Sequence, residues 1–455
     1  MTGAKYLKAA LLAAALLLPL QAHSQDAKEQ YQTGMIPSDH IMLPDGDVTA
    51  NIFLISGESG WSDDDQKEAE ALVEKGAAVV GIDFPKYIAA LKANDDECIY
   101  MISDIEELAQ EIQRKAGVSS YRPPIVAGIG GGGTLALAMI AQSPAATIGE
   151  AVAVDPLAGI PLDNILCTPA TKEKDNGRTI YGLTDGPLPA PVSVIFTPKA
   201  DEKGRKHVDD LVKLHADIDV NESTDDAKIS LAQTLQDRID AAGNTDNPLG
   251  LPLTVLEAKP TMDTMAIIYS GDGGWRDLDK DVGSFLQQDG VPTIGIDSLR
   301  YFWSEKKPQE IADDLSRIID TYRKEWKVKN VMLIGYSFGA DIIPVTFNAL
   351  SDKDKSRVVQ MSLLSLSHEV SYEISVGGWL GVSGSSEQDP VKDLAKINPK
   401  IVQCVYGTED DDAACPALKD KGVEIVGIEG GHHFDEDYEA LTKRIVAALR
   451  QRLKQ

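Results

Sequence analysis

Short apolar runs alternate with longer polar stretches along most of this chain. In the first half, the apolar and β-branched runs that have the length of buried strands are Asn51–Ser56, Ala77–Asp83 and Pro124–Gly128. In the second half, the corresponding runs are Ala266–Ser270, Pro292–Asp297 and Asn330–Gly335. Polar stretches long enough for helices separate successive runs. Strands that alternate with helices predict an α/β fold with a mainly parallel sheet covered on both faces.

The second half of the chain repeats the first. Residues 56–61 read Ser-Gly-Glu-Ser-Gly-Trp, and residues 270–275 read Ser-Gly-Asp-Gly-Gly-Trp. At the same offset, and without a gap, the Gly-Ile-Asp of residues 81–83 returns at residues 295–297. A repeat of this length, with strands and helices in the same order, indicates two tandem domains of one fold. A chain of 455 residues is also too long for one ordinary core.

A glycine-rich turn follows the third predicted strand of the second copy. Residues 335–339 read Gly-Tyr-Ser-Phe-Gly, which is G-x-S-x-G between an apolar strand and a helix. In α/β-hydrolases this strand–turn–helix context presents a nucleophilic serine above the sheet. We therefore predict that Ser337 is the nucleophile of a serine hydrolase. The alternative is a glycine-rich turn with an incidental serine.

The matching turn of the first copy carries no nucleophile. Residues 128–134 read Gly-Ile-Gly-Gly-Gly-Gly-Thr, so Gly130 stands where serine would be expected. A phosphate-binding loop is another interpretation, but the Lys-Ser/Thr of a P-loop is missing. The first copy also closes without a histidine motif. We predict two tandem α/β-hydrolase-like domains, a degenerate one at 47–243 and a catalytic one at 253–455, with a linker at 244–252.

A serine nucleophile needs a base, and the base needs an acid that orients it. In this fold the chain order is serine, acid, histidine, and the histidine follows the last strand. The predicted last strand ends at Ile428 and is followed by Glu-Gly-Gly-His-His-Phe. Counting from the end of that strand favours His433 as the base. His432 is the alternative.

The acid should follow the strand before the last. There Asp410 fits a Gly-x-x-Asp turn, as is common in hydrolases of this fold. The acids that stay open as alternatives are Glu409, Asp411 and Asp412. The oxyanion hole needs two backbone N–H groups. We expect them from Phe338, which follows the nucleophile, and from Asp272 in the loop after the first strand of this copy.

The start of the chain has a pattern of its own. Lys5 and Lys8 precede the apolar run Ala9–Leu20 and a small-x-small cleavage site, which predicts a secretory signal peptide at residues 1–24 and a further N-terminal segment at 25–46. Removal of the signal peptide takes away two of the 44 basic residues and none of the 71 acidic ones, leaving a formal charge of −29. Such an acidic chain is not expected to bind nucleic acid through phosphates. We expect a periplasmic protein.

Four cysteines divide two and two between the copies. In an oxidising compartment an even number of cysteines predicts disulfides. The natural pairing is Cys98 with Cys167 and Cys404 with Cys415. No pair has the spacing of a metal or redox motif, so neither a metal nor another cofactor is expected. A bond between Cys404 and Cys415 would clamp the loop that carries the predicted acid.

Four motifs together resemble the AcvB/VirJ family of virulence proteins, at residues 270–275, 298–303, 335–341 and 430–435. The signal peptide and the two-domain length look like the AcvB-like form of that family. The resemblance implies a periplasmic hydrolase that cleaves the ester between lysine and the headgroup of lysyl-phosphatidylglycerol. It also implies a link to virulence and type IV secretion, with peripheral contact to the inner membrane and secretion-system proteins as partners.

The lysyl group would carry two positive charges, which Asp272, Asp341 and Glu409 are expected to meet. Tyr301 and Trp303 offer cation–π faces or a lipid channel, and core packing is their other interpretation. For Asp341 the other role is support of the helix that follows the nucleophile. Two further functions stay open. One is a generic periplasmic carboxylesterase, and the other is a non-enzymatic secretion adaptor that acts through its N-terminal domain.

Overall fold

The computed structural model describes residues 31–243, 249–374 and 389–454. The predicted signal peptide and residues 244–248 of the predicted linker lie outside these ranges. Two seven-stranded sheets organise the described chain, and we call the residues around them the N-terminal copy (40–243) and the C-terminal copy (253–452).

The two sheets have the same strand order. The first runs β1-β3-β2-β4-β5-β8-β9 and the second runs β10-β12-β11-β13-β14-β15-β16. The strands of the first are β1 (His40–Met42), β2 (Ala50–Ile55), β3 (Ala77–Ile82), β4 (Ile125–Ile129), β5 (Glu150–Val154), β8 (Val192–Phe196) and β9 (Asp219–Glu222). Those of the second are β10 (Leu253–Leu256), β11 (Thr264–Tyr269), β12 (Thr293–Ile296), β13 (Asn330–Tyr336), β14 (Val358–Leu364), β15 (Val402–Gly407) and β16 (Glu424–Ile428). The predicted duplication of an α/β fold is confirmed.

Both sheets are parallel apart from one edge. Among the described strands, β1 runs antiparallel to β3 and β10 runs antiparallel to β12, while the other neighbours in each sheet are parallel. The carboxyl ends of the parallel strands therefore meet at one edge of each sheet, where the loops that follow them gather. Strand β1 begins at His40, so part of the segment predicted at 25–46 belongs to the first sheet.

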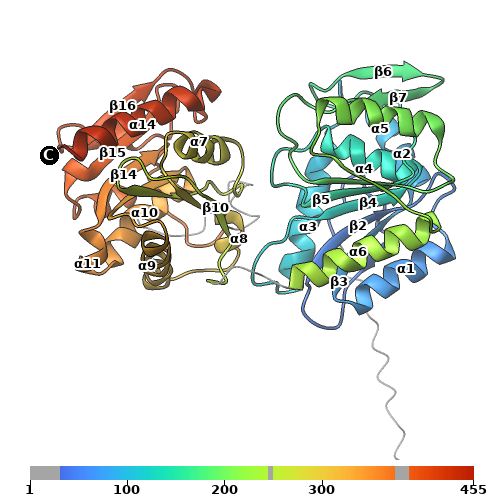
Figure 1. The fold of residues 1–455 in the computed structure, drawn as a ribbon, viewed down its shortest axis with the longest axis horizontal. Helices are drawn as coiled ribbons and strands as arrows, with labels where there is room; N and C mark the ends of the chain where they lie inside the picture. The colour runs from blue at the N-terminus through green and yellow to red at the C-terminus, as the bar shows by residue number, and fades with distance from the viewer. Residues whose placement is uncertain (1–30, 244–248, 375–388, 455) are drawn as a thin grey trace, which may run out of the picture. The chain divides into compact units, whose positions relative to one another are not determined.

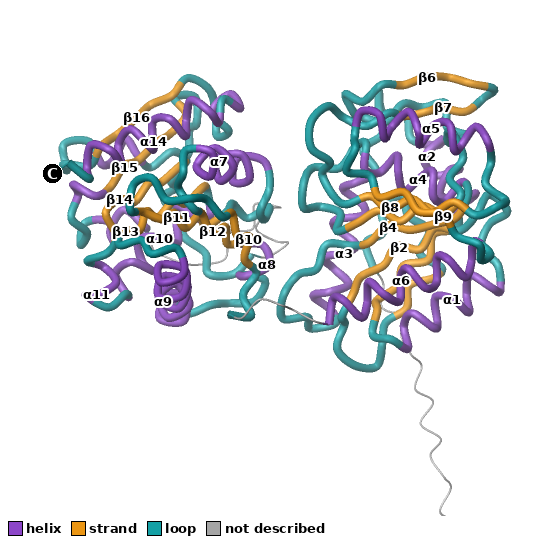
Figure 2. The backbone as a smooth tube through the Cα atoms, viewed as in Figure 1, coloured by secondary structure: helices purple, strands orange, loops and turns teal. Residues whose placement is uncertain are grey.

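Helices cover both faces of each sheet, and Figure 2 shows how they alternate with the strands along the chain. In the N-terminal copy, the helices are α1 (Asp63–Glu74), α2 (Phe84–Ala93), α3 (Ile102–Lys115), α4 (Gly131–Ile140), α5 (Glu202–Leu214) and α6 (Ala227–Gly243). Figure 1 shows α1 and α6 on one face of the first sheet, and α4 and α5 on the other. Leu72 of α1 and Leu235 of α6 are fully buried against the strands. The strands β6 (Lys172–Asp175) and β7 (Arg178–Tyr181) form a separate antiparallel hairpin.

The C-terminal copy has the same layering. Its helices are α7 (Asp277–Gln288), α8 (Ser298–Tyr301), α9 (Pro308–Glu325), α10 (Phe338–Ala349), α11 (Asp352–Lys355), α13 (Pro390–Leu394) and α14 (Tyr438–Arg452), with 3-10 turns η1 (Pro399–Ile401), η2 (Cys415–Leu418) and η3 (Phe434–Glu436). Val282 of α7 and Ile445 of α14 pack with Ile334 of β13 in one buried cluster. Helices α9 and α10 lie on the opposite face of the sheet (Figure 1).

Both predicted disulfides are present. Cys98 bonds to Cys167, and Cys404 bonds to Cys415, so each bond lies within one copy. Among the described residues, no helix combines the length and the apolar character needed to cross a membrane.

Candidate active site

Ser337 lies on a strained turn between β13 and α10. Its backbone has φ 51° and ψ −119°, a conformation that residues other than glycine rarely adopt. The turn is crowded, because a Cβ atom at Gly339 would meet the carbonyl oxygens of Tyr269 and Ser270, and one at Gly335 would meet the carbonyl of Gly339. This crowding explains both glycines of G-x-S-x-G.

Hydrogen bonds join Ser337, His432 and Asp410. The Ser337 hydroxyl lies 3.0 Å from His432 Nε2, and His432 Nδ1 lies 2.8 Å from Asp410 Oδ2. The three residues follow β13, β16 and β15, so the carboxyl edge of one parallel sheet brings them together. When Nδ1 donates to the Asp410 carboxylate, Nε2 faces the serine as a proton acceptor. This is the geometry of a nucleophile, a base and an orienting acid.

The structure corrects the predicted order of the two histidines. His432, the alternative, takes the position between serine and acid that the count from the strand end had given to His433. The loop is fixed by tertiary bonds: the Glu409 N–H donates to the Gly430 carbonyl at 2.9 Å, and the Ser365 hydroxyl donates to the His432 carbonyl at 2.9 Å. These bonds tie the histidine loop to the acid loop and turn His432 toward the acid.

His433 has a different partner. Its Nδ1 lies 2.9 Å from the hydroxyl of Tyr336, the residue before the nucleophile. Both side chains line the same cleft as Ser337. Within the described structure, His433 therefore lines the cleft beside Tyr336, while the bond to the serine comes from His432.

Asp410 is fixed by its own loop. Its backbone N–H donates to the Gly407 carbonyl at 3.1 Å, and its Oδ1 accepts from the Asp412 N–H at 3.2 Å. The disulfide between Cys404 and Cys415, 11 residues apart, closes the loop around it. The other acids of the run, Glu409, Asp411 and Asp412, are exposed. The structure thus brings Asp410, the first choice from the sequence, to the histidine.

A cleft of about 200 Å³ opens at Ser337. The loop after β11 and the start of α7 line much of it, and they contribute three acidic side chains, Asp272, Asp277 and Asp279, and one basic side chain, Arg276. Phe338 begins α10, where backbone N–H groups have no acceptor within the helix. Phe338 directly follows the nucleophile and Asp272 lines the same cleft, and their role as oxyanion donors stays a prediction.

The sequence reasoning missed Asp279. Its side chain is 2% exposed, and its Oδ2 accepts from the Gly271 N–H at 3.3 Å. Its Oδ1 is buried and has no hydrogen-bond partner in the described part of the chain. Burial raises the pKa of this carboxyl well above its usual value. An acid flanked by Leu278 and Val282 on the apolar face of a helix was the available signal.

The two aromatic residues predicted to contact the substrate, Tyr301 and Trp303, lie in the core. Tyr301 is 5% exposed, and its hydroxyl donates to Asp314 at 2.7 Å. Trp303 is 2% exposed. Neither these residues nor the exposed Glu409 are among the described residues that line the cleft. The structure supports the core-packing interpretation of Tyr301 and Trp303 instead of substrate contact, and the assignment of Glu409 to substrate binding stays a prediction.

Asp341 holds a loop. Its carboxylate accepts from the Ser367 N–H at 2.8 Å and from the Ser367 hydroxyl at 2.9 Å. Burial raises the pKa of Asp341 to about 8. The group thus links the first turn of α10 to the loop after β14.

Comparison with known proteins gives a family for the chain. The model of a family described as bacterial virulence protein (VirJ) matches residues 49–147 and 263–453, together more than half of the chain. A search of curated proteins returned no match.

Solved structures with some likeness cover about half of the chain. Est1E from Butyrivibrio proteoclasticus is 16% identical, with a TM-score of 0.33 over 45% of this chain and 93% of its own. An esterase from Exiguobacterium antarcticum is 14% identical, with a TM-score of 0.31 over 44% of this chain and 95% of its own.

Proposed function

Since the chain belongs to the VirJ family of bacterial virulence proteins, we propose that its C-terminal copy is a serine hydrolase. The substrate we propose is lysyl-phosphatidylglycerol, and the compartment is the periplasm. The observation that carries the hydrolase is the bonded series Ser337–His432–Asp410 on a strained strand–turn–helix. The substrate rests on the resemblance of the sequence motifs.

The geometry supports acyl transfer in two steps. The Ser337 oxygen attacks the ester carbonyl carbon while His432 Nε2 accepts the hydroxyl proton. The oxyanion is held by the backbone N–H groups of Phe338 and Asp272. His432 then gives the proton to the leaving glycerol oxygen, which releases phosphatidylglycerol and leaves lysine esterified to the serine. Water, deprotonated by the same histidine, attacks this ester and releases lysine. Asp410 stays ionised and orients the ring throughout.

The charges around the cleft suit a cationic acyl group. Asp272 and Asp277 line it against one cation, Arg276, and a carboxylate that meets an ammonium group in a partly dry site forms a strong hydrogen bond. The net charge of the chain is −27, which opposes approach to an anionic bilayer. Lysyl-phosphatidylglycerol is itself cationic, so a membrane patch rich in the substrate would reverse that repulsion locally.

The test compares the full chain with two serine variants. Ser337→Ala removes the nucleophile, and Ser304→Ala, an exposed serine of the same copy, is the control. Lysyl-phosphatidylglycerol in detergent micelles is the substrate, and released lysine is measured by mass spectrometry. We expect release by the full chain and by Ser304→Ala, and none by Ser337→Ala.

A fluorophosphonate probe and a simple chromogenic ester separate the two parts of the proposal. Labelling at Ser337 with turnover of the chromogenic ester but not of the lysyl lipid would leave the serine hydrolase standing and overturn the substrate. Absence of labelling together with unchanged lysine release in Ser337→Ala would overturn the active site.

A further inference from the structure

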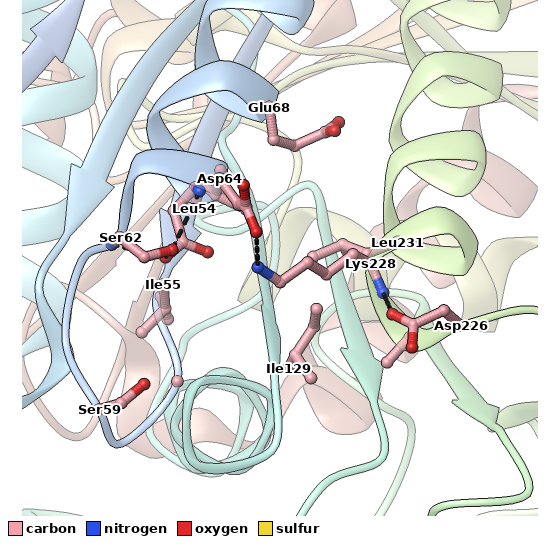
Figure 3. Close-up of a pocket in the computed structure, with 13 residues that line it drawn as sticks. Leu54, Ile55, Ser59, Ser62, Asp64, Glu68, Ile129, Asp226, Lys228 and Leu231 are labelled. Carbon is pink, nitrogen blue, oxygen red and sulfur yellow. Dashed lines mark hydrogen bonds and ion pairs between the residues drawn. The ribbon is translucent and has the colours of Figure 1, made fainter.

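The N-terminal copy contains a cavity of about 250 Å³ at the carboxyl ends of β2 and β4 (Figure 3). Leu54 and Ile55 end β2, and Ile129 ends β4. The other walls are the loop after β2 with the start of α1, and the start of α6. The cavity thus opens where the loops of a parallel sheet gather.

Its walls match those of the catalytic cleft element by element. The loop of residues 57–65 corresponds to residues 271–279, which line the cleft at Ser337. Ile129 precedes the elbow glycine as Tyr336 precedes the serine. Asp226 comes four residues after the end of β9, as His432 comes four residues after the end of β16. The cavity is the counterpart of a substrate cleft.

The chemistry of hydrolysis is missing from this counterpart. Gly130 offers no hydroxyl group, and Asp226 stands in place of the base. A ligand held here would therefore leave unchanged.

The floor of the cavity is apolar, and its rim is acidic. Leu54, Ile55, Ile129 and Leu231 supply aliphatic surface. Four carboxylates line the cavity against a single cation, and they are Asp64, Asp65, Glu68 and Asp226, with Lys228 opposite them. Such a lining suits a ligand with an aliphatic body and a positively charged end.

Three of these carboxylates are already engaged. Lys228 reaches from α6 to Asp64 on α1, at 3.0 Å, as Figure 3 shows. Asp65 accepts from the N-cap residue of α1 at 2.8 Å, and Asp226 accepts from Lys199 at 2.9 Å. Each therefore has a bonding partner within the chain.

Glu68 is the exception among the four carboxylates of the described lining. Its Oε1 atom is buried and has no hydrogen-bond partner. The carboxyl is half-buried, and burial raises its pKa. A buried acceptor without a donor costs free energy, which a ligand that donates to it would offset.

We propose that this cavity binds a small aliphatic ammonium compound, with Glu68 accepting from the ammonium group and the aliphatic chain lying on the floor. The volume, below that of most drug-sized sites, restricts the ligand to a short chain. Lys228, bonded to Asp64, places a positive charge in the same lining and opposes the entry of a second cation. The site belongs to the N-terminal copy, and its occupation does not depend on hydrolysis at Ser337.

The test uses hexylamine as the probe, with hexan-1-ol and hexanoate as neutral and anionic matches. Binding to the full chain is measured by isothermal titration calorimetry. We expect hexylamine to bind, and the alcohol and the carboxylate to bind at least tenfold more weakly, because a hydrogen bond to a charged partner is worth about that factor or more. Hexanoate or hexanol binding as tightly as hexylamine would overturn the proposal.

Three variants of the full chain assign the binding to this cavity. Glu68→Gln should weaken hexylamine binding about tenfold or more. Glu74→Gln, an exposed acid on the same helix, makes the same charge change and should leave affinity unaltered. Lys228→Gln removes the competing cation and should tighten binding. Equal affinity in all three variants and the unchanged chain would place the amine elsewhere and refute the site.

The outcome is separable from that of the proposed hydrolase. Ser337→Ala should bind hexylamine at the cavity with unchanged affinity, whatever its activity. A protein without esterase activity would leave the cavity proposal standing, and loss of the Glu68 effect would leave the hydrolase standing. Circular dichroism on each variant checks that the fold persists.

Discussion

Gly130 and Ser337 share one backbone conformation. Gly130 has φ 57° and ψ −118°, and Ser337 has φ 51° and ψ −119°, each between a strand and a helix of its own copy. The N-terminal copy has kept the elbow without the nucleophile. The strain at this position is thus a property of the fold, which the catalytic copy bears and which glycine avoids in the other.

A serine at position 130 should introduce backbone strain into the N-terminal copy without creating hydrolase activity there. Gly130→Ser should lower the free energy of unfolding by about 1–3 kcal/mol, because a serine there enters a sparsely allowed conformation. A Cβ atom at Gly130 meets nothing within 4 Å, so no clash contributes. Urea denaturation measures the loss. No hydrolysis should appear at this site, since it lacks a base, and activity assigned to Gly130→Ser in a Ser337→Ala background would contradict the assignment.

The complementary change is at the nucleophile. Ser337→Gly and Ser337→Ala should both lower kcat by about 10⁴–10⁶. The glycine variant should be the more stable of the two by about 1–3 kcal/mol, because alanine keeps the strained φ. Thermal and urea unfolding of the pair provide the comparison, and equal stability would show that the turn is not strained.

The two histidines should separate cleanly in kinetics. His432→Ala should remove nearly all hydrolysis because the Ser337 proton loses its acceptor. His433→Ala removes only a bond to Tyr336 and should keep most of kcat. Measuring kcat and KM of both variants on one ester decides the matter. A larger kcat loss for His433→Ala would restore it as the base.

The disulfides should differ in what they support. In the chain-entropy view, loss of the Cys98–Cys167 bond costs about 4 kcal/mol and loss of the Cys404–Cys415 bond about 3 kcal/mol, because the first closes the longer loop. Activity should show the opposite order, since the shorter loop holds Asp410. Variants with both cysteines of one pair replaced by serine, measured for free energy of unfolding and for hydrolysis, test whether the two orders are opposite. Parallel losses of both quantities would remove the special role of the second bond.

Stability should fall between about pH 4 and pH 8 through Asp341. Its folded pKa of about 8 lies above the ordinary 3.8, so the folded state binds this proton more tightly than the unfolded state does. The contribution is fully present below the unfolded value and is lost as pH rises through the folded one. Asp341→Asn should flatten that part of the profile, relative to the unchanged chain, in urea denaturation at successive pH values. An unchanged slope would show that Asp341 does not titrate there.

Headgroup charge should govern selectivity. Asp272→Asn should lower kcat/KM for lysyl-phosphatidylglycerol by about tenfold and change the alanyl lipid little, since only the lysyl side chain brings an extra cation. Asp411→Asn, an exposed acid outside the cleft, is the matched control. Both lipids are assayed in matched micelles at low salt. Equal effects on the two lipids would assign Asp272 to the reaction rather than to charge recognition.

The sequence was a good guide to features that local pattern determines. Apolar runs gave the strands that flank Ser337, and the turn glycines marked the nucleophile. The choice between His432 and His433 depended on a bond between Glu409 and Gly430, which lie in different loops. No local pattern carries that information.

Other misses have the same origin. Trp303 looked available for substrate because an aromatic run near a strand end has no sequence mark of burial. The edge strand β1 is short and has no fully buried residue, so its sequence pattern did not predict a strand. Asp279 joined the cleft because helix α7 turns that acid inward. Each of these depends on how elements pack.

The Cys404–Cys415 bond determines when the loop around Asp410 can close. Thiols stay reduced in a bacterial cytosol and become oxidised after export. A newly made chain would therefore hold its acid loop unclosed until it met an oxidant. With the periplasmic location proposed above, closure of the loop around Asp410 would coincide with arrival in the oxidising compartment.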